Sequence, residues 1–164
     1  MMSEQGSVAD HPQEDVNRER ASACLAEPAP LHLFPGIPFE YVEVLKSRGI
    51  DDSGIFLGVT RTLPHRTGLA TATGIPAYRI EEIRSLCDLS RVRGVVPGVA
   101  RVLYYVKIRS VEQLARESAS AIVQKVVPCS GTYARVIRSM NEKMMADCIR
   151  CARRIVLNDK RLKE

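Results

Sequence analysis

The sequence predicts an all-α protein in which two copies of one helical unit follow a disordered acidic tail. Three observations predict this arrangement. Apolar residues recur at helical spacing from Leu33 onward, Gly and Pro separate these segments at regular intervals, and the same pattern occurs twice along the chain. Hydrophobic residues make up 45% of the chain and aromatic residues 5%, with no Trp, so we expect an aliphatic core.

The composition also limits the function classes. The 164 residues suit one domain or two small ones. No run approaches the roughly 18 apolar residues of a membrane helix, and the N-terminus has neither a basic start nor an apolar stretch. We therefore expect a cytoplasmic location and no membrane partner. Five cysteines, an odd number, indicate free thiols in a reducing compartment.

Residues 1–32 are expected to form the disordered tail. Residues 1–33 carry six acids and two bases, three prolines interrupt the stretch, and apolar periodicity is nearly absent. The charge then reverses: residues 34–128 carry 13 bases and 9 acids, and residues 129–164 carry 9 bases and 4 acids. Residues 158–164 are expected to form a basic tail. A basic folded part can attract polyanions.

The first unit is expected over residues 33–87. Its helices begin, in order, near Pro38, Thr62 and Ile75. Gly49 and Gly74 follow the first two helices, where glycine tolerates the left-handed conformation that ends a helix. Thr62 caps the second helix, and Pro64 occupies its first turn.

The second unit is expected over residues 88–157. Its helices begin near Val99, Ser110, Ser120 and Thr132. Ser110 and Gln113 form a capping-box pattern. The run 132–156 is expected to be one basic helix with a narrow apolar stripe, formed by Val136, Ile137, Met140, Met144, Cys148, Cys151 and Ile155.

An internal repeat relates the two units. Laying Gly36 on Gly94 pairs Ile37 with Val95, Val44 with Val102, Leu45 with Leu103 and Ile50 with Ile108, and farther on Leu69 with Leu114. The first copy is longer by an insertion around residues 58–68. Each copy is expected to bury an apolar face against its twin.

The segment from Val92 to Leu103 resembles a helix-hairpin-helix motif, which reads apolar-x-Gly-apolar-Gly-x-x-x-Ala. Residues 34–50 and 73–83 are looser matches. The resemblance implies tandem helix-hairpin-helix units in a SAM-like helical bundle. Residues 33–155 are also similar to a bacterial and archaeal group known only as a domain of unknown function, through the phrases 88–95, 141–143 and 148–153.

In helix-hairpin-helix proteins that bind DNA, backbone amides at a helix N-terminus face a phosphate, independent of base sequence. The resemblance implies a site at Arg93, Gly94, Val95, Gly98 and Arg101, supported by Arg79 and by basic residues of the C-terminal helix. The ligand would be a DNA or RNA backbone. The sequence departs from the motif at its second glycine, which is replaced by Pro38, Pro76 and Val96 in the three matches.

Two other interpretations stay open. The hairpins can serve packing alone, which leaves a scaffold without nucleic-acid binding. Alternatively, the C-terminal helix can dock a protein partner or a second copy through Met140, Met144 and Met145, because methionine surfaces adapt to partners. The competing interpretation of these methionines is that they close the core.

We expect no enzyme activity, cofactor or metal. The three His residues lack triad spacing, and no Gly-Lys-Ser/Thr phosphate loop is present. The acidic pair Asp51-Asp52 is interpreted as helix-start charge, and Glu81-Glu82 as a solvated face. Cys148 and Cys151 form a single C-x-x-C, for which packing is a better interpretation than zinc, since a structural zinc site usually has four ligands.

Overall fold

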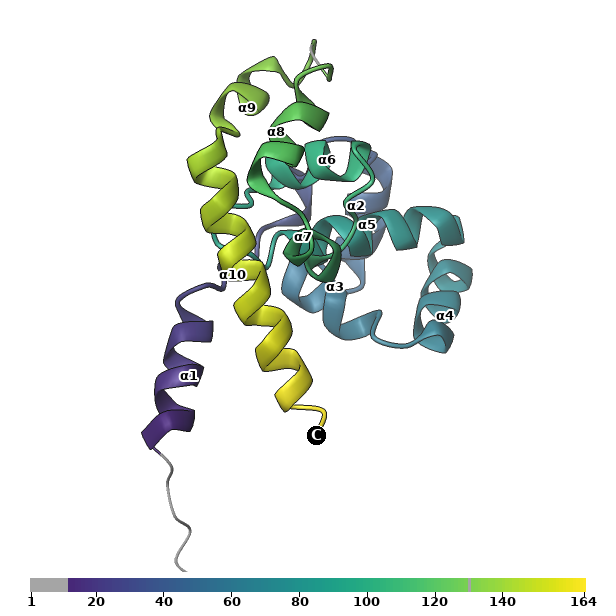
Figure 1. Ribbon diagram of the computed structural model, residues 1–164. Helices are drawn as coiled ribbons and strands as arrows, with labels where there is room; N and C mark the ends of the chain where they lie inside the picture. The colour runs from purple at the N-terminus through teal and green to yellow at the C-terminus, as the bar shows by residue number, and fades with distance from the viewer. Residues whose placement is uncertain (1–11, 130) are drawn as a thin grey trace, which may run out of the picture.

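The computed structural model describes residues 12–129 and 131–164, and within them it is all helical, which confirms the predicted class (Figure 1). Only two isolated backbone bridges, and no β-strand, occur among these residues. The helices are α1 (Pro12–Ser22), η1 (Leu31–Leu33), α2 (Phe39–Ser47), α3 (Ser53–Val59), α4 (Leu63–Thr73), α5 (Ala77–Leu89), α6 (Pro97–Tyr105), α7 (Val111–Ala115), α8 (Ala119–Val126), α9 (Ala134–Ser139) and α10 (Glu142–Arg161). None of the helices described is long and apolar enough to cross a bilayer.

The predicted helix ends in the first half are confirmed. The hydroxyl of Thr62 accepts a hydrogen bond from the backbone N–H of His65 at 3.3 Å, which starts α4. Helix α4 then ends at Gly74, which has a left-handed φ of 74°. Gly49 ends α2 in the same way with a φ of 76°, and this turn carries the chain back so that Ile50 is buried.

In the second half, Ser110 caps α7 as the sequence predicts. Ser110 accepts a hydrogen bond from the backbone N–H of Gln113 at 3.1 Å. The side chain of Gln113 in turn accepts one from the backbone N–H of Arg109 at 2.7 Å. Two otherwise unpaired donors at the start of α7 are thereby satisfied.

The C-terminal segment is two helices, so the prediction of one continuous helix was wrong. Helix α9 ends at Ser139, Met140 turns inward with 1% of its surface exposed, and α10 begins after Asn141. The Asn141 side chain accepts a hydrogen bond from the Met144 N–H at 2.9 Å, which makes it an N-cap that apolar periodicity does not reveal. Helix α10 continues to Arg161, so residues 158–161 are helical and not part of a tail.

Of the residues predicted to form a disordered tail, the structure describes 12–32, while residues 1–11 lie outside the described part. Helix α1 lies beside α10 (Figure 1). After it, the chain is tied to the segment between α5 and α6, because the N–H of Ala26 donates to the carbonyl of Arg91 and the N–H of Arg93 donates to that of Cys24, both at 2.8 Å. Contacts far along the chain therefore order a segment whose own composition favours disorder.

Two hydrophobic clusters fill the interior. One is formed by η1, by α2 to α5 and by the turns between them, and contains Leu31, Val42, Leu45, Ile50, Phe56, Leu69, Ile75, Ile80, Ile83 and Cys87. The other is centred on α6, α7, α8 and α10, extends to Leu86 and Leu89 of α5, and also takes in Cys24 and Phe34 from the N-terminal part. Helix α10 packs on α7 and α8 with one face, and α1 lies against its second half from another side.

Candidate nucleic-acid interface

The loop between α5 and α6 holds the predicted hairpin. Val92 and Val95 are buried and anchor it, while Arg93 and Gly94 between them are exposed. Gly94 has a φ of 94°, a conformation that glycine adopts without strain. A Cβ at this position would lie 3.0 Å from the Cys148 sulfur, so the loop backbone runs very close to α10.

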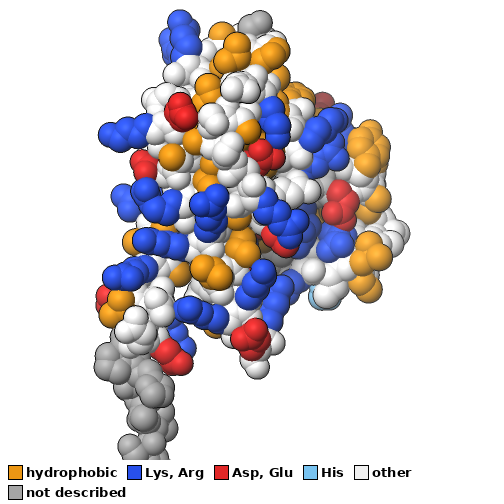
Figure 2. Space-filling model, in the orientation of Figure 1, with side chains coloured by type: hydrophobic (Ala, Val, Ile, Leu, Met, Phe, Trp, Pro, Cys, Tyr) orange, Lys and Arg blue, Asp and Glu red, His pale blue; other side chains and the backbone are white. Residues whose placement is uncertain are grey.

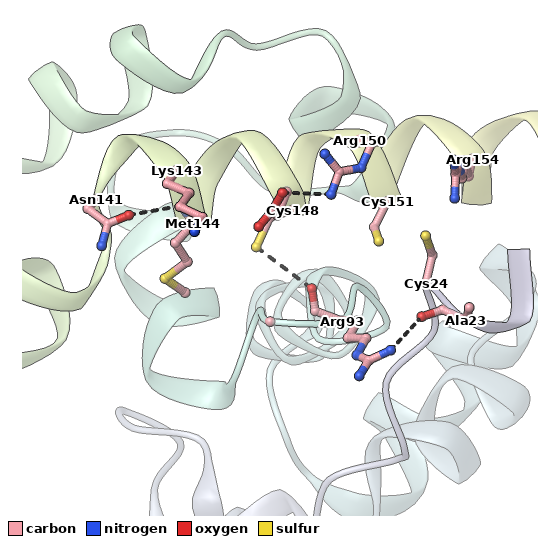
Figure 3. Close-up of a pocket in the computed structure, with 12 residues that line it drawn as sticks. Ala23, Cys24, Arg93, Asn141, Lys143, Met144, Cys148, Arg150, Cys151 and Arg154 are labelled. Atoms are coloured by element: carbon pink, nitrogen blue, oxygen red, sulfur yellow. Dashed lines mark hydrogen bonds and ion pairs between the residues drawn. The ribbon is translucent and has the colours of Figure 1, made fainter. Parts of the chain in front are cut away.

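A cleft of about 590 Å³ lies between this loop, the chain after α1, and the first half of α10 (Figure 3). Its lining residues are Ala23, Cys24, Arg93, Gly94, Asn141, Lys143, Met144, Asp147, Cys148, Arg150, Cys151 and Arg154. Four of them are cationic and one, Asp147, is anionic. We call this the loop–α10 cleft.

The cationic residues of α10 share one face of the helix. Lys143, Arg150, Arg154 and Arg161 follow one another at steps of seven, four and seven residues, which returns to the same side of an α-helix. They span roughly 27 Å at 1.5 Å per residue. The opposite face packs into the core through Met145, Cys148, Ile149, Ala152 and Ile155. Figure 2 shows Lys and Arg side chains gathered on this side of the molecule.

Among the cations that line the cleft, Lys143 and Arg154 carry charge that no acid of the described residues neutralises. Arg150 pairs with Asp147 at 2.6 Å, but both side chains are more than half exposed, so the pair is weak. In the described residues, neither Lys143 nor Arg154 takes part in an ion pair. The positive potential of the cleft therefore comes mainly from Arg93, Lys143 and Arg154.

Contrary to the prediction, Arg101 does not belong to the site, because its side chain is buried and cannot contact a ligand. Only 2% of its side chain is exposed. Its guanidinium donates to Glu82 Oε1 and to the backbone oxygen of Pro35, both at 2.6 Å. Glu82, expected on a solvated face, is likewise buried. Arg101 thus connects α6, α5 and the first hairpin, and its role is structural.

Arg79 also binds Glu82 and lies apart from the loop–α10 cleft. Its Nη1 donates to Glu82 Oε2 at 2.8 Å. This hydrogen bond, together with the charge of the carboxylate, raises the pKa of Arg79. A single carboxylate therefore engages two of the six predicted site residues.

The remaining predicted residues divide between core and cleft. Val95 is 2% exposed and packs inside. Gly98 lies under α9, where a Cβ would be 3.2 Å from a methyl group of Val136. Of the six predicted residues, only Arg93 and Gly94 line the cleft.

Sequence reasoning named none of the α10 cations of the cleft as individual site residues. It gave the basic C-terminal residues a supporting part only. The signal was available as the seven–four–seven spacing of Lys143, Arg150, Arg154 and Arg161. That spacing does not predict which loop packs opposite α10. The cleft forms only because the loop with Arg93 and Gly94 lies across from this charged helix face.

Three cysteines meet at the floor of the cleft. Cys148 and Cys151 project from the same side of α10, and Cys24 points toward Cys151 from the segment after α1 (Figure 3). Burial and then Asp147 raise the pKa of Cys148 to about 11. Burial and then the Cys24 thiol raise that of Cys151 to about 12. No group of three or more His, Cys, Asp or Glu suited to a metal ion is found in the part of the chain described.

Cys148 and Cys151 should react slowly with alkylating reagents, because the thiolate is the nucleophile and their raised pKa values keep both thiols protonated. At pH 8 only a small fraction of either thiol is expected to be ionised, and labelling should become faster as the pH rises. Iodoacetamide labelling of the native protein, followed by peptide mass spectrometry between pH 7 and 9.5, measures this. Urea-unfolded protein serves as the rapidly labelled control, and equal native and unfolded rates would contradict the expectation.

The methionines of the C-terminal segment lie largely inside the protein. Met140 is 1% exposed and Met145 is fully buried, while Met144 is partly exposed at the edge of the cleft. Two of the three residues expected for a docking surface therefore close the core. The structure favours the packing interpretation of this stripe over the docking one.

Comparison with known proteins places this architecture in a family. No curated protein and no solved structure matches the chain. A family model described as "Domain of unknown function (DUF4332)" matches residues 35–155, which include the loop and most of α10. Since the match covers well over half of the sequence, the chain belongs to the DUF4332 family.

Proposed function

We propose that the protein binds nucleic acid without sequence preference and that the loop–α10 cleft receives the phosphate backbone. The observation that carries this proposal is the convergence of Arg93, Lys143, Arg150 and Arg154 on one cleft that contains a single carboxylate. The first of these cations comes from the loop and the other three from α10. Their arrangement along a helix suits a linear polyanion better than a compact ligand.

The spacing of charge agrees with this ligand. Phosphates of one DNA strand lie about 3.4 Å apart along the axis, so the α10 part of the cleft from Lys143 to Arg154, roughly 17 Å long, faces about five of them. Guanidinium and ammonium groups bind phosphate oxygens through charge-assisted hydrogen bonds. Contacts of this kind position a duplex but read no bases. The predicted ligand is therefore a nucleic-acid backbone, and duplex DNA is the first one to test.

We further infer that residues 33–87 and 88–157 are two helix-hairpin-helix copies. Gly36 and Gly94 both have positive φ, at 81° and 94°. In each copy a nine-residue helix begins three residues after this glycine, and the cap of the next helix, Asp52 or Ser110, lies sixteen residues after it.

The order of the helices supports a different pairing in the later part of the repeat. Phe56 and Leu114 both lie twenty residues after the hairpin glycine and are both fully buried. Leu114 therefore corresponds to Phe56 in α3, and not to Leu69 in α4. Under this pairing α4 corresponds to α8, and the extra length of the first copy lies in α3 and α4, which are two and three residues longer than α7 and α8.

The test is the salt dependence of binding. If the four cations of the cleft each contact a phosphate, the logarithm of the association constant should fall with the logarithm of salt concentration at a slope of about −3.6. Affinity then drops about 150-fold between 50 and 200 mM NaCl. Fluorescence anisotropy with two 20-base-pair duplexes of unrelated sequence measures both slope and specificity.

We expect the two duplexes to bind equally and with the same slope. Absence of binding at 50 mM NaCl with 50 μM protein would refute nucleic-acid binding. A slope near zero, or a large preference for one sequence, would refute the backbone mechanism.

A further inference from the structure

Helix α1 and the second half of α10 enclose another cavity, of about 210 Å³, which we call the α1–α10 hollow. Its lining residues are Asn17, Arg20 and Ala21 from α1 and Arg154, Leu157, Asn158 and Arg161 from α10. Three arginines and two asparagines thus line one cavity, and neither Asp nor Glu is among its lining residues. These groups can all donate hydrogen bonds, which is the chemistry of an oxyanion site.

The three arginines are not neutralised by neighbouring acids. None of Arg20, Arg154 and Arg161 takes part in an ion pair within residues 12–129 and 131–164. Asp159, next along α10, is bound to Arg91 at 3.0 Å. Glu14 lines an adjacent cavity together with Arg18 and Arg161, but it forms no ion pair there.

Helix α1 has little apolar surface with which to hold this position. Among its described side chains only Ala21 is buried, and Val16 remains 39% exposed. An eleven-residue helix that is polar on all sides is marginal in isolation. Arg20 moreover faces Arg154 and Arg161 across the contact, and like charges repel. An anion between them converts that repulsion into attraction.

We propose that the α1–α10 hollow is a phosphate-binding site. In it, Arg20, Arg154 and Arg161 bind one phosphate group, which stabilises the packing of α1 on α10. The planar guanidinium fork matches two phosphate oxygens at once, and the amides of Asn17 and Asn158 can donate to the others. A cavity of about 210 Å³ is several times the roughly 30 Å³ of one liquid water, so a phosphate fits with part of its hydration shell.

The phosphate group has two possible sources. It can be a free inorganic phosphate or pyrophosphate, which makes the site independent of the proposed function. It can also belong to a nucleic-acid strand that leaves the loop–α10 cleft, because Arg154 lines both cavities. In the second case the inference rests on the proposed function and extends its binding path over α1.

The test uses the full chain and pyrophosphate as the probe. Isothermal titration calorimetry, with the ionic strength held constant by NaCl, measures the affinity for pyrophosphate. Amide hydrogen exchange of residues 13–22 measures how firmly α1 packs on α10. Wild type is expected to bind pyrophosphate and to gain protection in α1. Arg20→Gln with Arg161→Gln should weaken binding at least about tenfold and abolish the added protection.

Arg18→Gln is the matched control, because it removes one positive charge from the same helix without lining the hollow. It should change pyrophosphate affinity by less than about threefold. The proposal is overturned if wild type fails to bind pyrophosphate at millimolar concentration. It is overturned equally if the double variant binds as wild type does.

A 20-base-pair duplex then separates the two sources. If Arg20→Gln with Arg161→Gln weakens pyrophosphate binding and leaves duplex binding unchanged, the site serves a small phosphate. If both fall together, the hollow is a continuation of the nucleic-acid path. If the wild-type protein binds pyrophosphate but does not bind the duplex, the proposed nucleic-acid function is wrong and the phosphate site remains.

Discussion

Replacing Arg101 by Met is expected to lower the free energy of unfolding by about 3–5 kcal/mol, because the change removes the buried cation that pairs with the Glu82 carboxylate. Glu82 loses its 2.6 Å contact with Arg101, and only the contact with the more exposed Arg79 remains. The carbonyl of Pro35 loses its donor as well. Urea unfolding followed by circular dichroism measures the loss at pH 7.

A double variant distinguishes the stranded charge from lost packing. Arg101→Met with Glu82→Leu removes both charges and should recover most of the stability, since apolar residues of similar volume often replace a buried ion pair at little cost. A loss below about 1 kcal/mol in Arg101→Met alone would contradict the structural role of this arginine. No recovery in the double variant would assign the loss to packing around Tyr104 and Tyr105, which flank the guanidinium.

The burial of Arg101 also decides how nucleic-acid binding should be tested. Reversal of charge at Arg101 would place two carboxylates together in the interior and unfold the protein, so a loss of binding would carry no information about the site. Surface cations of the loop–α10 cleft are the informative positions.

Lys143→Glu combined with Arg154→Glu is expected to weaken duplex binding about 100-fold at 100 mM NaCl and to reduce the salt slope by about 1.8. Both side chains are exposed on the solvent face of α10 and belong to no ion pair of the described residues, so the fold should be unaffected. Fluorescence anisotropy gives the affinity and the slope, and circular dichroism verifies the helical content.

The matched control reverses the same amount of charge on another element. Lys46 and Arg48 are exposed at the end of α2, remote from the cleft lining. Lys46→Glu with Arg48→Glu should change affinity by less than about fivefold, because a distant charge acts only through screened long-range potential. Equal losses in both double variants would mean that net charge, and not the cleft, attracts the nucleic acid.

Residues that act within one turn of the chain could be predicted from the sequence. Thr62 and Ser110 cap the helices they were expected to cap, and Gly49 and Gly74 end theirs in the left-handed conformation. Such positions depend on a side chain and a backbone group three or four residues away. The break between α9 and α10 at Met140 could not be predicted in this way. Met140 is buried there because of the distant helices it packs against.

The candidate site could be predicted only in part, for the same reason. Arg93 and Gly94 were identified from the hairpin pattern and line the cleft. Arg101 belongs to the same pattern and is buried, because Glu82, nineteen residues earlier, is folded against it. A one-dimensional pattern does not distinguish an arginine that faces solvent from one that faces a buried carboxylate.

The sequence by itself therefore determined that this protein is helical, where most of its helices begin and end, and that its C-terminal third is basic. Only the tertiary structure decided which of those basic groups face a common cleft and which arginine lies in a buried ion pair. Helix caps and apolar periodicity are local energies, summed over a few neighbouring residues. Burial and the convergence of charges depend on segments brought together from more than 50 residues apart, such as Arg93 and α10.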